Sequence, residues 1–181
     1  MKQTLISDPS SVLLGRGIFR IDGNVFGATQ GGGKFTLERE YRSTAVDGAK
    51  GALKGFTFNE GSTPKLEISN LEIINDDIVK RHPALKASVT DGKTTITGKN
   101  DIADNDYHTV EFIGHTKAGK EVVITVENAI NLENIEFDLK EKSEVIDTCT
   151  FTGTYPLEYD EDYEPWSITY PTQTIEKGEQ A

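Results

Sequence analysis

A glycine-rich segment, residues 28–34, is the first place in this 181-residue chain where residue spacing could support chemistry. The spacing from Ala28 to Lys34 is close to that of a phosphate-binding P-loop. However, Phe35 stands where a P-loop needs Ser or Thr to reach magnesium, and the following residues alternate as in a strand. A phosphate site also needs a helix N-terminus behind the glycines. The segment therefore predicts a turn between two strands.

Nucleophiles and metal ligands are few. Cys149 is the single cysteine, which excludes an intrachain disulfide and an all-cysteine zinc site. It shares a strand face with Phe151 and Gly153, which indicates a buried, unreactive thiol. The histidines have no metal or triad spacing, although a Ser, a His and an acid could still converge in the fold. They are His82, His108 and His115. We expect no catalytic residue, no cofactor and no metal site, and therefore no enzyme.

Two acidic clusters could attract divalent cations. The first holds three aspartates in residues 101–106, but it lacks the ligand spacing and the glycine of an EF-hand. The second holds five acids within residues 158–164. No cleft of sugar-stacking aromatic residues is indicated beside them, so paired carboxylates do not suggest a glycosidase. We expect both clusters to lie in solvated surface loops.

The elements that position these side chains are mostly strands. Twenty threonines, 16 isoleucines and 17 glycines favour β-structure, because β-branched side chains fit a pleated sheet and glycines mark turns. Residues 34–44 alternate clearly, and the apolar face changes around Asn70, between residues 66–69 and 71–73, which indicates a bulge or bend. Turns such as Asp91-Gly92 separate the segments, so we expect a β-sandwich or barrel of about eight strands. The other expected strands are residues 12–21, 25–27, 93–97, 109–114, 121–127, 133–140, 145–155 and 166–170.

One short helix is expected to flank the sheet. Asn75 or Asp76 can cap it, Lys80 and Arg81 lie in its last turn, and Pro83 ends it. Residues 128–132 are a weaker helix candidate.

The chain is expected to be one domain with three less core-like segments. The domain spans residues 12–172, between a polar arm of residues 1–11 and a polar tail of residues 173–181. Within it, residues 43–63 are rich in glycine and poor in large apolar side chains, which predicts a long loop or an extended hairpin.

The composition and net charge of the chain exclude some classes of function. Leu, Ile, Val and Phe together number 45 of 181 residues, enough for a folded core. Residues 1–120 hold 16 basic and 15 acidic residues, whereas residues 121–181 hold 3 and 15, so the net charge of −11 comes from the last third. Such acidity disfavours DNA binding. We find neither a signal peptide nor a membrane span, and expect a protein that crosses no membrane.

Several stretches together resemble the major tail tube proteins of long-tailed, non-contractile bacteriophages of Gram-positive hosts. The matching stretches are residues 17–23, 26–32, 46–51, 54–55, 64–67, 151–153 and 164–168. The resemblance implies a β-sandwich with a flanking helix, hexameric rings, and rings stacked into a tube through which DNA leaves the capsid. It also implies that the long loop and the terminal arms bridge neighbouring subunits or rings.

The resemblance assigns residues to these contacts. The ring-to-ring contacts would involve Asp47, Gly48, Lys50, Gly51, Lys54 and Gly55. The lumen should repel DNA, so we expect acids to line it, with Glu136 and Asp138 on the polar face of strand 133–140 and Ile135, Phe137 and Leu139 in the core.

The resemblance also implies partners and a location. The partners would be further copies of the chain and other tail proteins, such as the tape measure and the tail terminator, while DNA passes without specific binding. The protein would be made and assembled in the host cytoplasm and act in the virion tail. The alternative is a β-sandwich binding module of a phage baseplate or adhesin, with an aromatic patch at one loop end.

Overall fold

The computed structural model describes residues 11–75 and 77–171, which form a mostly β fold with one short α-helix, as predicted. The expected tail, the expected arm apart from Ser11, and the expected cap Asp76 lie outside the described residues. No helix in residues 11–75 and 77–171 is long and apolar enough to cross a membrane. The strands are β1 (Leu13–Ile21), β2 (Asn24–Val25), β3 (Thr29–Ser43), β4 (Thr57–Asn70), β5 (Leu85–Thr90), β6 (Lys93–Gly98), β7 (His108–Thr116), β8 (Glu121–Asn131), β9 (Asp147–Gly153) and β10 (Trp166–Thr169). The helices are α1 (Ile78–Arg81) and the 3-10 helix η2 (Asp104–Asp106).

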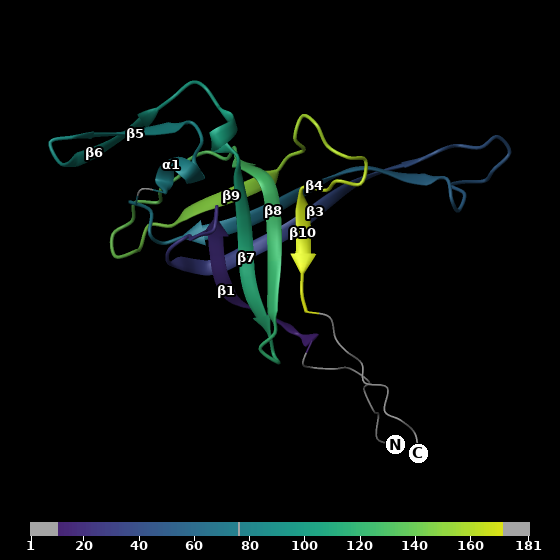
Figure 1. Cartoon of the computed structure of the whole chain (residues 1–181), viewed down its shortest axis with the longest axis horizontal. Helices are drawn as coiled ribbons and strands as arrows, with labels where there is room; N and C mark the ends of the chain where they lie inside the picture. Colours follow the sequence, from purple (N-terminus) through teal and green to yellow (C-terminus); the bar gives the residue numbers. More distant parts are fainter. Residues whose placement is uncertain (1–10, 76, 172–181) are drawn as a thin grey trace, which may run out of the picture.

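One antiparallel sheet folds over on itself into two layers, with β1, β7, β8 and β10 crossing β9, β4 and β3 (Figure 1). β8 belongs to both layers, because its residues 123–126 pair with β10 and its residues 129–131 pair with β9. Between them Asn128 adopts a φ of 47°, a left-handed conformation that Asn tolerates better than most residues. The strand can therefore turn from one layer into the other. β5 and β6 form a separate hairpin.

The core fills the space between the two layers. Period-two alternation places one face of each strand inward, and β9 shows it clearly, with Cys149, Phe151 and Gly153 all buried as predicted. Aromatic contacts join the layers, and the Phe26 and Phe151 rings meet edge to face at 5.8 Å. The buried cluster consists of Phe19, Ile21, Phe26, Leu66, Ile68, Val110, Phe112, Val126, Ala129, Cys149 and Phe151.

β3 and β4 continue beyond the sandwich as a long hairpin (Figure 1, blue). β9 pairs with β4 only over residues 65–70, whereas β3 pairs with β4 as far as Ser43 and Thr57. Residues 39–62, which we call the β3–β4 arm, therefore hold two strands and the connection of residues 44–56. Of the two forms expected for residues 43–63, the structure has the extended hairpin.

Three local predictions are wrong. Residues 133–140 form no strand and lie in the connection between β8 and β9, with Ile135 and Leu139 exposed. Alternation fixes which side chains would share a face, but a strand also needs backbone pairing, and within the described part of the chain residues 133–140 pair with no strand. Residues 128–131 continue β8 instead of forming a helix. Residues 71–73 form no strand, although the bend predicted around Asn70 is present at Leu71, directly after β4 ends.

Two glycines in β1 provide a test of how closely the strands pack. A Cβ at Gly17 would lie 2.3 Å from the carbonyl oxygen of Ile113 and 2.5 Å from the Phe112 ring, whereas a Cβ at Gly15 would have no neighbour within 4 Å. Gly17→Ala should therefore force β1 away from β7 and lower the free energy of unfolding by about 1–3 kcal/mol. Gly15→Ala should change it by less than about 0.5 kcal/mol. Urea denaturation measures both, and equal effects would contradict the close approach of β1 to β7.

Candidate functional site

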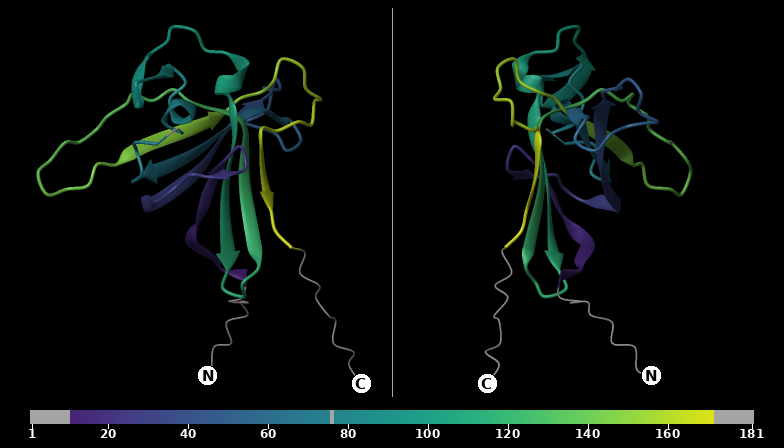
Figure 2. Two further views of the ribbon diagram at one scale, coloured as in Figure 1. Left: turned by 60° about the vertical axis from the view of Figure 1, so that its left-hand side comes forward. Right: turned by 90° about the vertical axis from the view of Figure 1, so that its right-hand side faces the viewer.

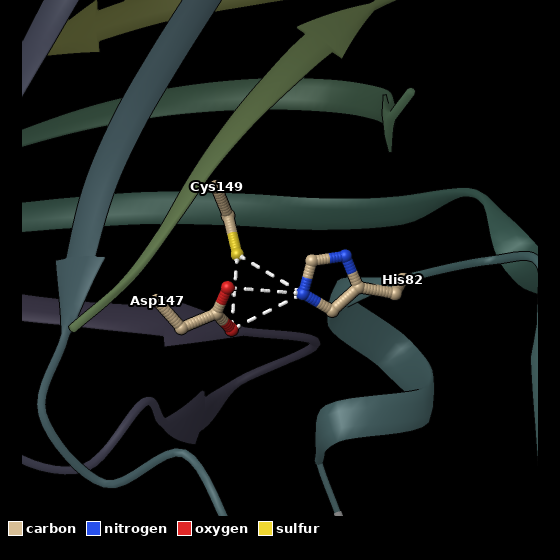
Figure 3. Close-up of side chains that lie close together, drawn as sticks. All are labelled: His82, Asp147 and Cys149. Carbon is tan, nitrogen blue, oxygen red and sulfur yellow. Dashed lines mark hydrogen bonds and ion pairs between the residues drawn. The ribbon is translucent and has the colours of Figure 1, made fainter. Parts of the chain in front are cut away.

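A buried polar cluster lies where the end of α1 meets the start of β9. Figure 3 shows His82, Asp147 and Cys149 pointing toward one another. His82 Nε2 lies 3.1 Å from each oxygen of Asp147 and 3.9 Å from Cys149 Sγ, and Sγ lies 3.6 Å from Asp147 Oδ2. None of the three is more than 2% exposed. Together with Arg81 we call them the Asp147 cluster.

Arg81 is fully buried, and its guanidinium has three separate acceptors. Nε donates to Asp147 Oδ2 at 3.0 Å, Nη1 to Asn75 Oδ1 at 2.9 Å, and Nη2 to the carbonyl oxygen of Ile73 at 2.7 Å. Asn75 Oδ1 also accepts from the backbone N–H of Asp77, but the N-cap of α1 is Asp77 and not Asn75 or Asp76, so the predicted cap is wrong by one or two residues. The Arg81 guanidinium therefore links the segment before α1 to Asp147, the first residue of β9.

The hydrogen bonds of His82 assign its tautomer. Nδ1 lies 3.4 Å from the Asn131 amide nitrogen, a donor, so Nδ1 accepts and Nε2–H donates to Asp147. In a Cys-His-acid nucleophile site the acid holds one ring nitrogen and the thiol faces the other. Here Asp147 and Cys149 face the same nitrogen. The arrangement therefore does not activate the thiol for catalysis.

Electrostatics agree with this conclusion. Burial, and then the negative charge of Asp147, raise the pKa of the Cys149 thiol well above its usual range. Burial alone would raise the pKa of Asp147 as well, but its bonds to His82 and Arg81 outweigh burial, so this pKa is lowered. The cluster thus holds a neutral thiol beside a charged, paired carboxylate.

A second carboxylate, Glu164, lies in the connection between β9 and β10 and binds side chains at both of its ends and on β4. Its Oε2 accepts hydrogen bonds from Ser62 Oγ on β4, from Tyr155 Oη at 3.2 Å and from Trp166 Nε1 at 3.2 Å. Burial would raise the pKa of Glu164, but these donors outweigh it and lower the pKa. Glu164, one of the five acids in residues 158–164, therefore has a structural role, and the other four are exposed.

The other sequence candidates lie apart from the Asp147 cluster. The predicted turn over residues 28–34 is wrong, because the segment forms the start of β3; Gly31 and Gly32, with φ of 87° and 78°, lie where the pairing with β4 shifts register between Thr29 and Gly33. In the aspartate loop, Asp106 accepts from Lys99 Nζ at 2.6 Å and from the Ala103 N–H at 2.8 Å, which leaves it paired within the chain. His108 pairs with Asp22 at 2.7 Å.

The predicted assembly residues all lie at the tip of the β3–β4 arm. They are Asp47, Gly48, Lys50, Gly51, Lys54 and Gly55, and all six are exposed. Gly48 and Gly55 adopt φ of 83° and 87°, so each turn at the tip needs a residue that tolerates the left-handed region.

Glu136 and Asp138 are exposed as expected, but they lie in an irregular connection, because residues 133–140 form no strand. This connection projects from the sandwich (Figure 2, green). It enters β9 at Asp147, which pairs with Asn70 at the end of β4 farthest from the arm. The two predicted groups of functional residues therefore lie at opposite ends of β4.

The Asp147 cluster was missed because its parts are 65 to 67 residues apart in the chain. One signal could have found it. The inward face that holds Cys149 and Phe151 also includes Asp147, two residues earlier, and a carboxylate on a buried strand face needs a cationic partner.

Breaking the central ion pair tests the cluster. Asp147→Asn leaves the Arg81 guanidinium buried without its counter-charge, so the free energy of unfolding should fall by about 3–5 kcal/mol. Asp138 forms an ion pair with Lys140, but its side chain is 77% exposed, so Asp138→Asn is the matched control and should change stability by less than about 0.5 kcal/mol. Equal effects in urea denaturation would show that the Arg81–Asp147 pair is not central to stability.

Glu164 predicts a pH dependence. Because its pKa is lowered on folding, its contribution is present above the unfolded pKa of about 4.3 and is lost as pH falls through the folded value. The stability difference between the wild type and Glu164→Gln should be largest above about pH 5 and shrink below it. Glu158→Gln, at an exposed position, is the control. A difference that stays constant from pH 7 to pH 3 would contradict the prediction.

The described residues thus offer a buried charged cluster with no catalytic geometry and an exposed arm that carries the predicted assembly residues. No family model matches the chain, and no curated protein sequence shows significant similarity to it.

Proposed function

We propose that the protein is a structural subunit that assembles into hexameric rings stacked as the tail tube of a non-contractile bacteriophage. The observation that carries the proposal is the β3–β4 arm, which extends beyond the sandwich and exposes large apolar side chains. The resemblance of the sequence to tail tube proteins gives the arm its proposed partner, a neighbouring copy of the chain.

The side chains of the arm favour contact with another molecule. The arm strands pair only with each other beyond β9, and an ion pair between Arg42 and Glu60 at 2.6 Å supports their pairing. Large apolar side chains exposed along a projecting element suit contact with another molecule, because contact removes them from water. The exposed apolar residues of the arm and their exposed fractions are Tyr41 (64%), Val46 (39%), Leu53 (40%), Phe56 (43%) and Phe58 (46%).

Open strand edges also suit ring closure. Among the described residues, β3 pairs only with β4, and β10 pairs only with β8, so each has one unpaired edge. Such edges invite pairing with other chains, and a closed ring would cover them.

Charge supplies a second complementary feature. The arm tip carries Lys50 and Lys54, whereas the exposed acids of residues 158–162 follow β9 near the base of the arm. In the proposed tube, the arm of one subunit meets this acidic loop of the next. The connection of residues 132–146, with Glu136 and Asp138, then faces the lumen and repels passing DNA. A tube reconstruction with a neutral or basic lumen would contradict this part.

Shortening the arm tests the assembly. Ser43 and Thr57 are paired, so replacing residues 44–56 by Asn-Gly should close the hairpin with a two-residue turn and leave the sandwich folded. Concentrated wild-type protein should form tubes with stacked rings in negative-stain electron micrographs, directly or after nucleation. The shortened protein should form none, with an unchanged circular dichroism spectrum.

Point variants can distinguish the effect of apolar side chains on the arm from the effect of exposed apolar side chains elsewhere. Tyr41→Ser with Phe58→Ser removes two apolar side chains from the arm and should impair tube formation. Val89→Thr removes a similar exposed apolar group, 72% exposed, from the β5–β6 hairpin and should leave assembly intact. Normal tubes from the shortened protein would refute the role of the arm.

The alternative function, a binding module of a phage baseplate or adhesin, is favoured by one observation. Tyr155, Tyr159 and Tyr163 pack with ring centroids 5.1–6.3 Å apart, beside an open cavity of about 490 Å³ lined by Tyr107 and Leu157 among others. A binding module would remain monomeric at all concentrations in size-exclusion chromatography with light scattering. Growth of the particles with concentration would favour the tube.

A further inference from the structure

We propose that the Asp147 cluster is a structural zinc site, with His82 Nε2, Asp147 Oδ2 and Cys149 Sγ as three ligands and the Asn70 side-chain oxygen as the fourth. This inference is independent of tube assembly, and it departs from the sequence-based expectation of no metal site. Nitrogen, carboxylate oxygen and thiolate sulfur are all common ligands of Zn²⁺ in proteins.

The distances between the three ligand atoms suit a tetrahedral ion. Bonds of about 2.3 Å to sulfur and 2.0–2.2 Å to nitrogen and oxygen, at tetrahedral angles, require ligand atoms about 3.3–3.6 Å apart. The observed separations are 3.1 Å from His82 Nε2 to Asp147 Oδ2, 3.6 Å from Cys149 Sγ to that oxygen, and 3.9 Å from Sγ to Nε2. Adjustments of a few tenths of an ångström would bring all three into the range.

The side chain of Asn70 gives a second, independent indication of a bound ligand. It is fully buried, and its Oδ1 has no hydrogen-bond partner among the described residues, while its Nδ2 lies 4.0 Å from Cys149 Sγ. A buried oxygen without a partner costs about 1–3 kcal/mol. Rotating the amide by 180° exchanges Oδ1 and Nδ2, two atoms that are hard to tell apart. The oxygen then faces Cys149 Sγ, where a cation would be its partner, while Nδ2 takes the position in which the oxygen had none.

The outer contact of Asp147 fits a metal site, whereas the contact of His82 Nδ1 has to change when zinc binds. Arg81 Nε donates to Asp147, and ligating carboxylates commonly keep such a partner. Zinc displaces the Cys149 thiol proton, which leaves to solvent, and forms a Zn–S bond. The imidazole proton moves from Nε2 to Nδ1 of His82, which ends the long 3.4 Å contact from Asn131. The ion adds two positive charges and one proton leaves, so the buried charge rises by one, which is the main cost of binding.

Such a site would fix the short helix to the sheet. Its ligands come from three places: His82 follows α1, Asn70 ends β4, and Asp147 and Cys149 lie on β9. All four are buried, so the metal would enter as the protein folds rather than by diffusion into the finished structure.

Metal-loaded protein provides the test. The full chain is unfolded, stripped with chelator and refolded with Zn²⁺ or Co²⁺ in a reductant that contains no thiol. We expect one metal ion per chain after desalting. Co²⁺ should give the visible bands of a tetrahedral ion and a sulfur-to-metal charge-transfer band in the near ultraviolet. Free Zn²⁺ at a hundred times Kd should raise the Tm by roughly 5–10 °C.

Two variants decide the assignment. Cys149→Ala, a small apolar replacement at a buried position, should fold, lose the charge-transfer band and lose the zinc-dependent rise in Tm. His115→Gln, at an exposed histidine outside the cluster, should behave as the wild type. Wild-type protein that retains no stoichiometric metal, or a Co²⁺ spectrum without the sulfur band, would overturn the proposal even if Cys149→Ala did not fold. So would equal metal binding by Cys149→Ala.

Discussion

The carboxylate of Asp147 is the group on which the arrangement around the core depends. At 1% exposure it must find donors inside the protein, and Arg81 and His82 supply them from the end of α1. A helix of four residues is too short to be stable by itself. The pairing therefore holds α1 in place, and the remaining donors of Arg81 satisfy Asn75 and Ile73 in the chain that leaves β4.

β4 ends beside the Asp147 cluster and also forms one strand of the β3–β4 arm. This strand therefore connects the protein interior to the proposed assembly surface. β4 is largely buried toward Asn70 and exposed from Thr57 to Glu60. A free loop would lose much conformational entropy on docking, whereas a hairpin continuous with a packed sheet is already ordered along its strands. The paired strands of the arm therefore lose little conformational entropy when they contact another molecule, and only the connection at the tip still has to become ordered.

Local signals predicted most of the fold, and long-range pairing accounts for what they missed. The turn at Asp91-Gly92 and the alternation of β9 depend on neighbouring residues, and both appear as expected. The strand predicted over residues 133–140 failed because alternation within a segment does not supply the pairing partner that a strand needs. β5 was not predicted, since it forms only by pairing with β6. The Asp147 cluster required His82 and Cys149 to meet across 67 residues, which spacing motifs do not detect.

The fold also divides the acidity of the last third of the chain by location. Asp147 and Glu164 accept hydrogen bonds from other residues of the chain. The exposed acids of residues 158–162 follow β9 at the end near the arm, where contact with Lys50 and Lys54 of a neighbour would neutralise them. Residues 132–146 hold five acids against two lysines, at the far end of β4, away from any basic arm. If the arms join the subunits, residues 132–146 keep an excess of acids over lysines, and they are the group that could repel DNA.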